Sequence, residues 1–370
     1  MNTEPKVSII TVCLNSEKTI RDTIESVIRQ TYRNIEYIIV DGGSTDSTLS
    51  IINEYREYIT EIISEKDKGI YDAFNKGINL STGEIIGIIN SDDWYVDDAV
   101  EVSVNAMIEN SAEFCCANIT IVDTDNNMHI SCSNIYAEQW FGNKIMHPTV
   151  FASKELYNCI GLFDNSYKIA SDYKWILEVF LNNRRVTYID KAIVYFRKGG
   201  ISTDPDCRVR TLTEGYQVVS DLISKYELHS KEYYDVLAFW REAIFKAKVD
   251  EVLMKRPEIL KTFLRDERGT DTVVIWGTGH YGRMIIDTCL KTQIEVQYLI
   301  DSNPIKQNKT IYDMRIRKPD EIENDYSTVF LAIDLKDERI HELISKHRVD
   351  RNRIITLNDI RKYIGRKLAL

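Results

Sequence analysis

Hydrophobic and polar residues alternate in blocks along the first 110 residues of the chain. Short apolar runs rich in Ile and Val are typical of strands buried in a parallel sheet. Here they occupy 7–13, 35–40, 60–64 and 84–90. Apolar residues at helical spacing predict amphipathic helices, the first capped by Ser16, at 16–30, 47–57, 70–80 and 97–109. This alternation predicts a parallel sheet with helices on both faces.

Beyond residue 110 the pattern is less regular. The further predicted elements are strands at 113–122 and 186–197, a short strand or loop at 147–151 and a helix at 172–181. Residues 206–265 have a helical pattern, and the apolar run 272–276 then opens a last α/β segment. We therefore predict three parts, which are an N-terminal α/β domain (1–205), a helical connector (206–268) and a C-terminal α/β domain (269–370).

Composition narrows the class of protein. A chain of 370 residues is long enough for two or three domains. Its net charge of -10 argues against a nucleic-acid binder, which needs a basic face. The seven cysteines are scattered without a CxxC pair, as in reduced intracellular proteins. No apolar run approaches the roughly 20 residues that span a bilayer, and residues 1–6 do not resemble a signal peptide. We expect a cytoplasmic protein.

Two adjacent carboxylates, Asp92 and Asp93, follow the predicted strand 84–90. In open α/β sheets, ligands bind outside the carboxyl ends of the strands. Paired acids repel each other unless a cation offsets their charge. The pair therefore indicates either a metal site or a cap for the helix that begins near Asp97, and the pattern alone leaves both open.

Two further polar segments follow predicted strands. Asp-Gly-Gly-Ser-Thr-Asp at 41–46 is either an ordinary glycine turn or a loop whose glycines let the backbone approach a ligand. The segment 65–77 is unusually polar for a helix entry. Asp67 and Asn75 can hydrogen-bond a ribose or a base, and Lys76 can neutralise a phosphate. The alternative is a solvated, charged helix.

Taken together in this order, these motifs resemble the family 2 glycosyltransferases with the GT-A fold, especially bacterial enzymes of O-antigen and capsule assembly. The resemblance covers about residues 5–203. It rests on Val-Ser-Ile-Ile-Thr at 7–11, Val-Asp-Gly-Gly-Ser-Thr-Asp-Ser-Thr at 40–48, Asp-Lys-Gly-Ile-Tyr-Asp-Ala-Phe-Asn-Lys-Gly at 67–77, Asn-Ser-Asp-Asp at 90–93 and Ala-Ser-Asp-Tyr at 170–173.

The resemblance implies transfer of a sugar from a nucleotide-diphosphate donor to an acceptor hydroxyl, with inversion of the anomeric carbon. It implies Mg²⁺ or Mn²⁺ as cofactor, because a hard cation binds carboxylate and phosphate oxygens together. Asp92 then ends the Asp-x-Asp motif as metal ligand, with Asp93 as a further ligand. Asn90 departs from the motif's usual first Asp, although it can accept from a ribose hydroxyl. Phe74 stands where many relatives carry an arginine for the diphosphate.

The resemblance also assigns roles to single residues. Asp172 aligns with the general base, although by itself it also suits the N-cap of a helix over 173–181. Asp41 reads the base, Asp67 is a second nucleotide contact, and Thr11 offers backbone contacts beneath the base. His147 faces the donor sugar or the metal, or is structural, as lone histidines usually are. Trp94 and Tyr95 either form part of the sugar pocket or pack under it. The segment 199–202 either folds over the diphosphate as a mobile segment or is the start of a plain linker.

The last predicted domain carries Gly-Thr-Gly-His-Tyr-Gly at 277–282 between a strand and a helix, with Asp301 after the next strand. This is the context of a dinucleotide fingerprint. The segment 270–357 resembles a small Rossmann-like domain of sugar-modifying enzymes, but it has room for only half a dinucleotide fold. Three interpretations of this domain stay open. It binds NAD, it binds a nucleotide or nucleotide sugar, or it binds no ligand and serves in packing or homo-oligomerisation. The tail 360–368 suits either a membrane surface or a solvated helix.

The sequence thus predicts a cytoplasmic, metal-dependent, inverting hexosyl- or N-acetylhexosaminyl-transferase. UDP-sugar is the default donor, and the acceptor is a saccharide on a polyprenyl diphosphate, at the inner face of the membrane in surface polysaccharide assembly. One alternative is a non-catalytic GT-A scaffold that binds a sugar nucleotide and partners another enzyme. Another is an NAD-dependent sugar oxidoreductase, for which neither a complete dinucleotide domain nor a catalytic Tyr/Lys pair is evident.

Overall fold

The chain divides into two compact units, which we describe separately. The computed structural model describes residues 4–123, 125–135, 139–200, 205–322, 328–333, 342, 345–347 and 349–368. The N-terminal unit comprises residues 1–241 and the C-terminal unit residues 242–370. The division falls within one helix of the predicted connector, and the three-part division proposed above stays a prediction.

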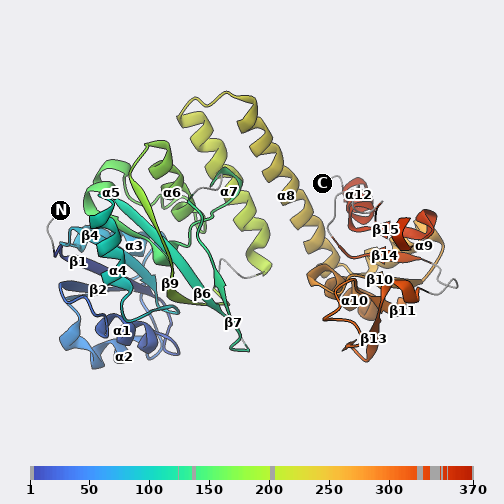
Figure 1. Ribbon diagram of the computed structural model, residues 1–370, viewed down its shortest axis with the longest axis horizontal. Helices are drawn as coiled ribbons and strands as arrows, with labels where there is room; N and C mark the ends of the chain where they lie inside the picture. The colour runs from blue at the N-terminus through green and yellow to red at the C-terminus, as the bar shows by residue number, and fades with distance from the viewer. Residues whose placement is uncertain are drawn as a thin grey trace. The chain divides into compact units, whose positions relative to one another are not determined.

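The N-terminal unit is built on one mixed sheet with the strand order β3-β2-β1-β4-β8-β6-β9-β5, to which β7 adds by pairing with β6 (Figure 1). Its strands are β1 (Val7–Cys13), β2 (Ile35–Asp41), β3 (Glu61–Ser64), β4 (Ile85–Asn90), β5 (Trp94–Tyr95), β6 (Phe114–Val122), β7 (Met128–Ser131), β8 (Phe151–Ser153) and β9 (Val186–Arg197). Strands β1 to β4 pair in parallel, as their apolar runs predict. Their carboxyl ends therefore meet at one edge of the sheet.

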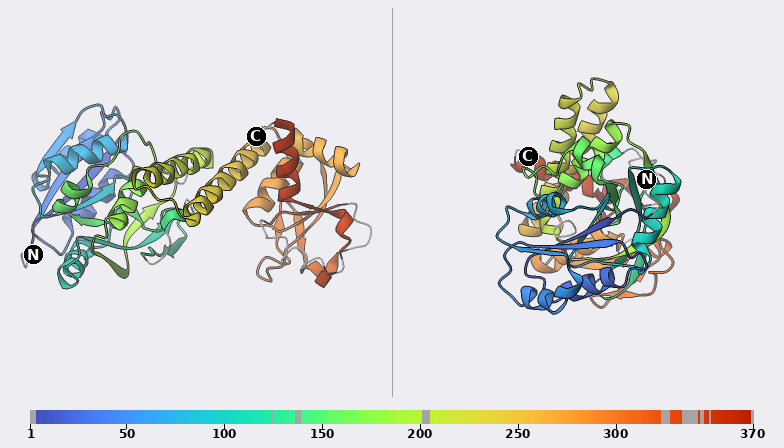
Figure 2. Two further views of the ribbon diagram at one scale, coloured as in Figure 1. Left: turned by 90° about the horizontal axis from the view of Figure 1, so that it is seen from above. Right: turned by 90° about the vertical axis from the view of Figure 1, so that its left-hand side faces the viewer.

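Helices cover both faces of this sheet. They are α1 (Ile20–Ile28), α2 (Thr48–Glu54), α3 (Ile70–Leu80), α4 (Ala99–Glu109), α5 (Lys154–Ile160) and α6 (Ser171–Leu181). Short 3₁₀ turns lie at Arg56–Tyr58, Gln139–Phe141 and His147–Thr149. Apolar residues of α1, α2 and α4 share one buried cluster with the sheet, and those of α3, α5 and α6 share another (Figures 1 and 2). The predicted layers are thus confirmed. The Ser16 cap is wrong, because α1 begins at Ile20 and the Ser16 hydroxyl hydrogen-bonds Ser91.

A buried carboxylate joins three segments at the opposite end of the sheet from the strands' carboxyl ends. Glu36 on β2 is 5% exposed and accepts hydrogen bonds from Ser8 (2.5 Å), from the Thr82 amide (2.7 Å) and from Lys6 (3.0 Å). Burial by itself raises the pKa of Glu36, but these hydrogen bonds outweigh it and lower the pKa to about 2.

This network predicts a pH-dependent part of the stability. In the unfolded chain Glu36 becomes protonated near its ordinary pKa of 4.5. In the folded chain it stays ionised until the pH falls to about 2. The stabilisation is therefore present above pH 4.5 and lost as the pH falls toward 2, about 2 kcal/mol after allowance for solvent screening. Urea unfolding of the wild type and of Glu36→Gln at several pH values checks this. We expect the gap between them to close with acid, and a constant gap would contradict it.

Two helices follow a 3₁₀ turn at Pro205–Cys207 and form a hairpin in the N-terminal unit. They are α7 (Arg208–Lys225) and the first part of α8 (Lys231–Lys255). Val218, Val219 and Leu222 of α7 and Trp240 of α8 are buried in one cluster with Tyr173 and its neighbours in α6. This part of the predicted connector is therefore packed on the domain that precedes it.

The C-terminal unit holds a second sheet, in the order β12-β13-β11-β10-β14-β15. Its elements are α9 (Glu258–Arg268), β10 (Thr272–Trp276), α10 (His280–Thr292), β11 (Glu295–Ile300), β12 (Thr310–Ile311), β13 (Met314–Arg317), β14 (Val329–Leu331), β15 (Ile354–Thr356) and α12 (Leu357–Leu368), with 3₁₀ turns at Pro319–Glu321 and Arg351–Arg353. All pairs except β12·β13 are parallel. The α/β class predicted for this segment is confirmed.

The C-terminal tail is part of the core of this unit. Ile360 and Ile364 of α12 are fully buried in a cluster with α9 and α10. Arg361 is 2% exposed and pairs with Asp250 at 3.2 Å. The two interpretations of the tail, a membrane-surface helix and a solvated helix, are therefore both wrong for its apolar face. Within the described residues, no helix combines the length and apolar character that crossing a membrane requires.

Candidate nucleotide-sugar site

Hydrogen bonds connect the loops at the carboxyl ends of β1, β2 and β4. The Asn15 amide after β1 donates to the Ser44 hydroxyl after β2 at 2.8 Å, and the Asn15 side chain accepts from the Thr45 amide at 2.9 Å. The hydroxyls of Ser16 and Ser91, after β1 and β4, lie 2.7 Å apart. Three segments that are distant in the sequence thus form one continuous edge. Sequence reasoning missed Asn15, although it lies two residues after the buried strand β1.

The Asp-Gly-Gly segment after β2 brings two predicted nucleotide contacts together. Asp41 is fully buried and accepts from the Ser44 amide (3.1 Å) and from the Ser64 hydroxyl (2.7 Å). A Cβ on Gly42 would lie 2.3 Å from Oδ2 of Asp67, so a larger residue here would have to displace that carboxylate. The loop is therefore shaped by its own carboxylate, and Asp67, which is partly exposed, borders it.

The acidic pair after β4 divides into an exposed and a buried member. Asp92 is partly exposed, whereas Asp93 is fully buried and its Oδ1 accepts from the Arg197 amide at 3.0 Å. The residue before α4 is Asp98, so the interpretation of the pair as a helix cap is wrong. Among the described residues, Oδ2 of Asp93 and Oδ1 of Asn90 are buried without a hydrogen-bond partner.

The electrostatics of this pair favour an added positive charge. Burial raises the pKa of Asp92. Burial and, next, the charge of Asp92 raise the pKa of Asp93 well above its ordinary value. The nearby cation is Arg197, whose guanidinium donates to the Asp92 carbonyl at 3.2 Å, contacts Asp22 at 2.9 Å and lies over the Trp94 ring at 4.8 Å. Sequence reasoning missed Arg197, although a charged residue that ends a strand before two glycines is a usable signal.

These residues fit a divalent cation that is shared with substrate phosphates. Within the described part of the chain, no three His, Cys, Asp or Glu side chains gather as a closed metal site. Mg²⁺, however, is commonly bound through one or two carboxylates together with phosphates and water. Asp92 offers an accessible carboxylate, and the orphaned Oδ2 of Asp93 lies in the next residue. The complete burial of Asp93 makes Asp92 the better ligand of the two.

Asp172 lies in the first turn of α6, beside a tyrosine of α3. Its Oδ1 is 2.9 Å from the Tyr71 hydroxyl. The N-cap residue of α6 is Ala170, so the cap interpretation of Asp172 is wrong. Burial, and then the charge of Asp172, raise the pKa of Tyr71 well above its ordinary value, so the phenol stays protonated as a donor. Sequence reasoning did not assign a role to Tyr71.

His147 belongs to an aromatic wall near Asp172. Its ring stacks on Phe74 with centroids 5.3 Å apart and an interplanar angle of 12°. Burial lowers the pKa of His147, and the charge of Asp172 opposes this shift. The stacking supports the structural interpretation, while the role of His147 toward the donor stays a prediction.

Two predicted contacts have other partners in the structure. The Asn75 amide donates to the Phe163 carbonyl (2.8 Å) and accepts from the Phe163 amide (3.0 Å), so it fixes that segment. Lys76 pairs with Glu65 at 2.8 Å and with Asp72 at 3.4 Å, and does not replace the arginine that Phe74 displaces. Asn75 and Lys76 thus both have partners within the protein, and their contacts with the donor stay predictions.

Thr11 lies inside the sheet. It is fully buried, its hydroxyl is 3.0 Å from that of Tyr37, and its backbone pairs within β1 with β2 and β4. Its predicted contact beneath the base stays a prediction. Gly200, by contrast, lies close to the acidic pair, because an added Cβ would be 3.5 Å from Oδ2 of Asp92. The rest of that segment, Ile201 and Ser202, is outside the described residues.

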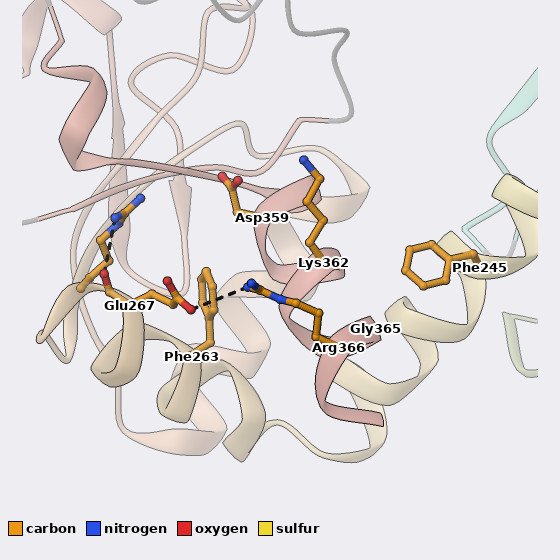
Figure 3. Close-up of a pocket in the computed structure, with 8 residues that line it drawn as sticks. Phe245, Phe263, Glu267, Asp359, Lys362, Gly365 and Arg366 are labelled. Atoms are coloured by element: carbon orange, nitrogen blue, oxygen red, sulfur yellow. Dashed lines mark hydrogen bonds and ion pairs between the residues drawn. The ribbon is translucent and has the colours of Figure 1, made fainter. Parts of the chain in front are cut away.

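The C-terminal unit contains an open pocket of about 540 Å³ between α8, α9 and α12 (Figure 3). The residues that line this pocket include acidic and basic side chains and two phenylalanines. Arg366 contacts Glu267 at 3.8 Å. Asp301, which follows β11, accepts a hydrogen bond at 2.9 Å from the amide of Thr278 in the glycine-rich loop 277–282. The carboxylate that would bind a ribose in a dinucleotide site is thus engaged within the protein. This partner weakens the NAD interpretation.

Comparison with known proteins finds similarities in both units. Residues 8–162 match the family model "Glycosyl transferase family 2". Residues 269–355 match the model "C2185-like, N-terminal". Glycosyltransferase GlyA of Streptococcus pneumoniae is 27% identical over 55% of this chain and 32% of its own length. A PGL/p-HBAD biosynthesis glycosyltransferase of Mycobacterium bovis is 29% identical over 54% of this chain and 79% of its own length. The chain thus matches about a third of the first relative and four fifths of the second.

Solved structures confirm the GT-A fold. S. aureus TarS (residues 1–349) in complex with UDP-GlcNAc has a TM-score of 0.51 and 19% identity, covering 78% of this chain and 90% of that one. The mannosyltransferase PcManGT of Pyrobaculum calidifontis, in complex with GDP-Man and Mn²⁺, has a TM-score of 0.51 and 14% identity, covering 79% and 88%. These structural likenesses concern the fold. The sequence matches support a transferase enzyme, and residues 8–162 are similar to glycosyl transferase family 2.

Proposed function

We propose that the N-terminal unit transfers a hexosyl or N-acetylhexosaminyl group from a nucleotide-diphosphate donor to a saccharide hydroxyl, with inversion. The observation that carries the proposal is the continuous edge formed by the loops after β1, β2 and β4. This edge collects a glycine turn, the partly exposed Asp67 and the partly exposed Asp92. Ligands of open α/β sheets bind at such an edge.

The donor side of the site has two parts. Asp41 shapes the loop against which the base lies, and Asp67 contacts the nucleotide. Asp92, supported by Asp93, would hold Mg²⁺ or Mn²⁺. When bound, this cation would offset the charge of the diphosphate leaving group. Arg197 adds a fixed positive charge beside Asp92. We expect UDP as the nucleotide of the donor, although the two similar structures contain different donors.

Asp172 is the general base of the proposed reaction. Its carboxylate takes the proton of the acceptor hydroxyl as the hydroxyl oxygen attacks the anomeric carbon. The bond from that carbon to the diphosphate oxygen breaks, and the nucleoside diphosphate leaves with both electrons of the bond. One direct displacement inverts the anomeric carbon. The Tyr71 hydroxyl orients the carboxylate from 2.9 Å.

The proposed acceptor is a saccharide on a polyprenyl diphosphate, used in surface polysaccharide assembly at the inner face of the membrane. The resemblance of motifs to O-antigen and capsule enzymes supports this part. A non-catalytic scaffold that shares the fold would bind the donor without transfer. The acidic pair and Asp172 together favour the enzyme.

Thermal unfolding with a panel of UDP-, GDP- and dTDP-sugars, with and without Mn²⁺, tests the donor site. A ligand that binds only the folded chain raises its melting temperature. We expect one nucleotide class, UDP, to give the largest shift, with a larger shift in Mn²⁺. The control is the same panel with the free sugars, which lack the diphosphate. No shift with any nucleotide, with or without metal, would contradict the proposal.

A further inference from the structure

We infer that Glu214 of α7, in the predicted connector, is a positioning residue for sugar transfer, because it fixes the loop that leads into α6 and Asp172. The inference rests on the proposed function and extends it. Glu214 lies outside every motif that resembles the glycosyltransferase family and outside residues 8–162, which match the family model.

The contact is a carboxylate that binds three successive peptides. Oε2 of Glu214 accepts from the amides of Lys168 (2.9 Å), Ile169 (2.7 Å) and Ala170 (3.1 Å). Hydrogen bonds to an ionised acceptor are roughly twice as strong as neutral ones. One oxygen thus sets the path of the backbone up to Ala170, the residue before α6.

The same loop contacts the partners of the proposed base. The Ile169 carbonyl accepts from the Tyr71 hydroxyl at 2.6 Å, and that hydroxyl is also 2.9 Å from Asp172. The Lys168 ammonium donates to the Lys68 carbonyl before α3 at 3.1 Å. A shift of the loop therefore moves Asp172 and Tyr71 together.

Helix α7 holds Glu214 in place. The next residue, Gly215, packs so closely on Trp240 of α8 that an added Cβ would lie 2.5 Å from the indole. Val218 and Leu222 of the same helix are fully buried. Because a displacement of about 1 Å can cost 10²-fold in rate, losing this support is expected to impair transfer more than donor binding.

The test compares Glu214→Ala and Glu214→Gln with Glu232→Ala, which removes an exposed glutamate from α8. We expect Glu214→Ala to lower kcat about 10-fold to 100-fold with an unchanged donor KM. Glu214→Gln, whose amide oxygen can still accept, should recover most of the loss, and Glu232→Ala should match the wild type. Amide hydrogen exchange at 168–170 should become faster in Glu214→Ala only.

Separate outcomes distinguish the inference from the proposed function. A wild-type kcat in Glu214→Ala, with unchanged exchange at 168–170, overturns the role of Glu214 alone. If kcat, donor binding and melting temperature all fall together in Glu214→Ala, the residue is merely structural, and the inference is also overturned. A wild type that transfers no sugar from any donor overturns the proposed function, and the inference falls with it.

Discussion

Replacing Asp172 by Asn is expected to lower kcat by about 10²- to 10⁴-fold, the usual contribution of general acid–base catalysis. Asn has the same shape and can still accept the hydrogen bond from Tyr71, which is 2.9 Å long in the structure. It cannot take the proton of the acceptor hydroxyl. Donor binding should therefore stay intact while transfer is lost. Steady-state kinetics at saturating donor, beside donor-induced thermal shifts, measure both.

The matched control is Asp190→Asn. Asp190 is an exposed carboxylate of β9 that accepts from the Asn118 amide at 3.1 Å, in the same unit as Asp172. This variant should keep the kcat of the wild type. Equal turnover of Asp172→Asn and the wild type would remove Asp172 as the base. Loss of donor binding in Asp172→Asn would instead assign it to the donor side.

Replacing Asp92 by Asn is expected to remove the effect of Mn²⁺ on donor binding and to lower kcat at least about 100-fold. A metal ion contributes several kcal/mol to stabilising charge in the transition state, and about 1.4 kcal/mol changes a rate tenfold. An amide keeps the size of Asp92 but loses the charge that holds the cation. Titration of Mn²⁺ in the presence of donor, followed by thermal unfolding and by turnover, measures the effect.

Asp97→Asn controls for the loss of one negative charge in the same segment. Asp97 is 69% exposed and lies 3.6 Å from Arg29, and such surface pairs contribute little. Its response to Mn²⁺ should equal that of the wild type. If Asp92→Asn also keeps the full response, the metal site lies elsewhere or the enzyme works without a metal.

Local pattern was sufficient for most elements near the site. The predicted helix 70–80 is α3 (Ile70–Leu80), and the predicted strand 7–13 is β1 (Val7–Cys13). Both follow from the spacing of apolar residues, which decides which face is buried. The convergence of polar loops at one edge was predictable too, because carboxyl ends of parallel strands meet there. β5 (Trp94–Tyr95) was missed, since it exists only through pairing with β9.

The partners of polar side chains were not predictable in the same way. Asn75 and Lys76 lie in a segment that resembles a family motif, yet Asn75 fixes Phe163, 88 residues away, and Lys76 pairs with Glu65 and Asp72. Glu214 had no motif at all. The sequence does not show which distant backbone group a side-chain amide or carboxylate will hydrogen-bond. Its partner depends on how separate helices pack.

By itself, the sequence determined the α/β class of both units and the parallel strands β1 to β4, because burial and strand direction follow from local periodicity. It also determined the edge of the sheet at which Asp41 ends β2 and at which Asp67 and Asp92 follow β3 and β4. Only the tertiary structure decided that Asp93 is buried under Arg197, that Asp172 meets Tyr71, and that α7 braces the loop before α6. These contacts join segments up to about a hundred residues apart. Packing, which no local pattern encodes, selects them.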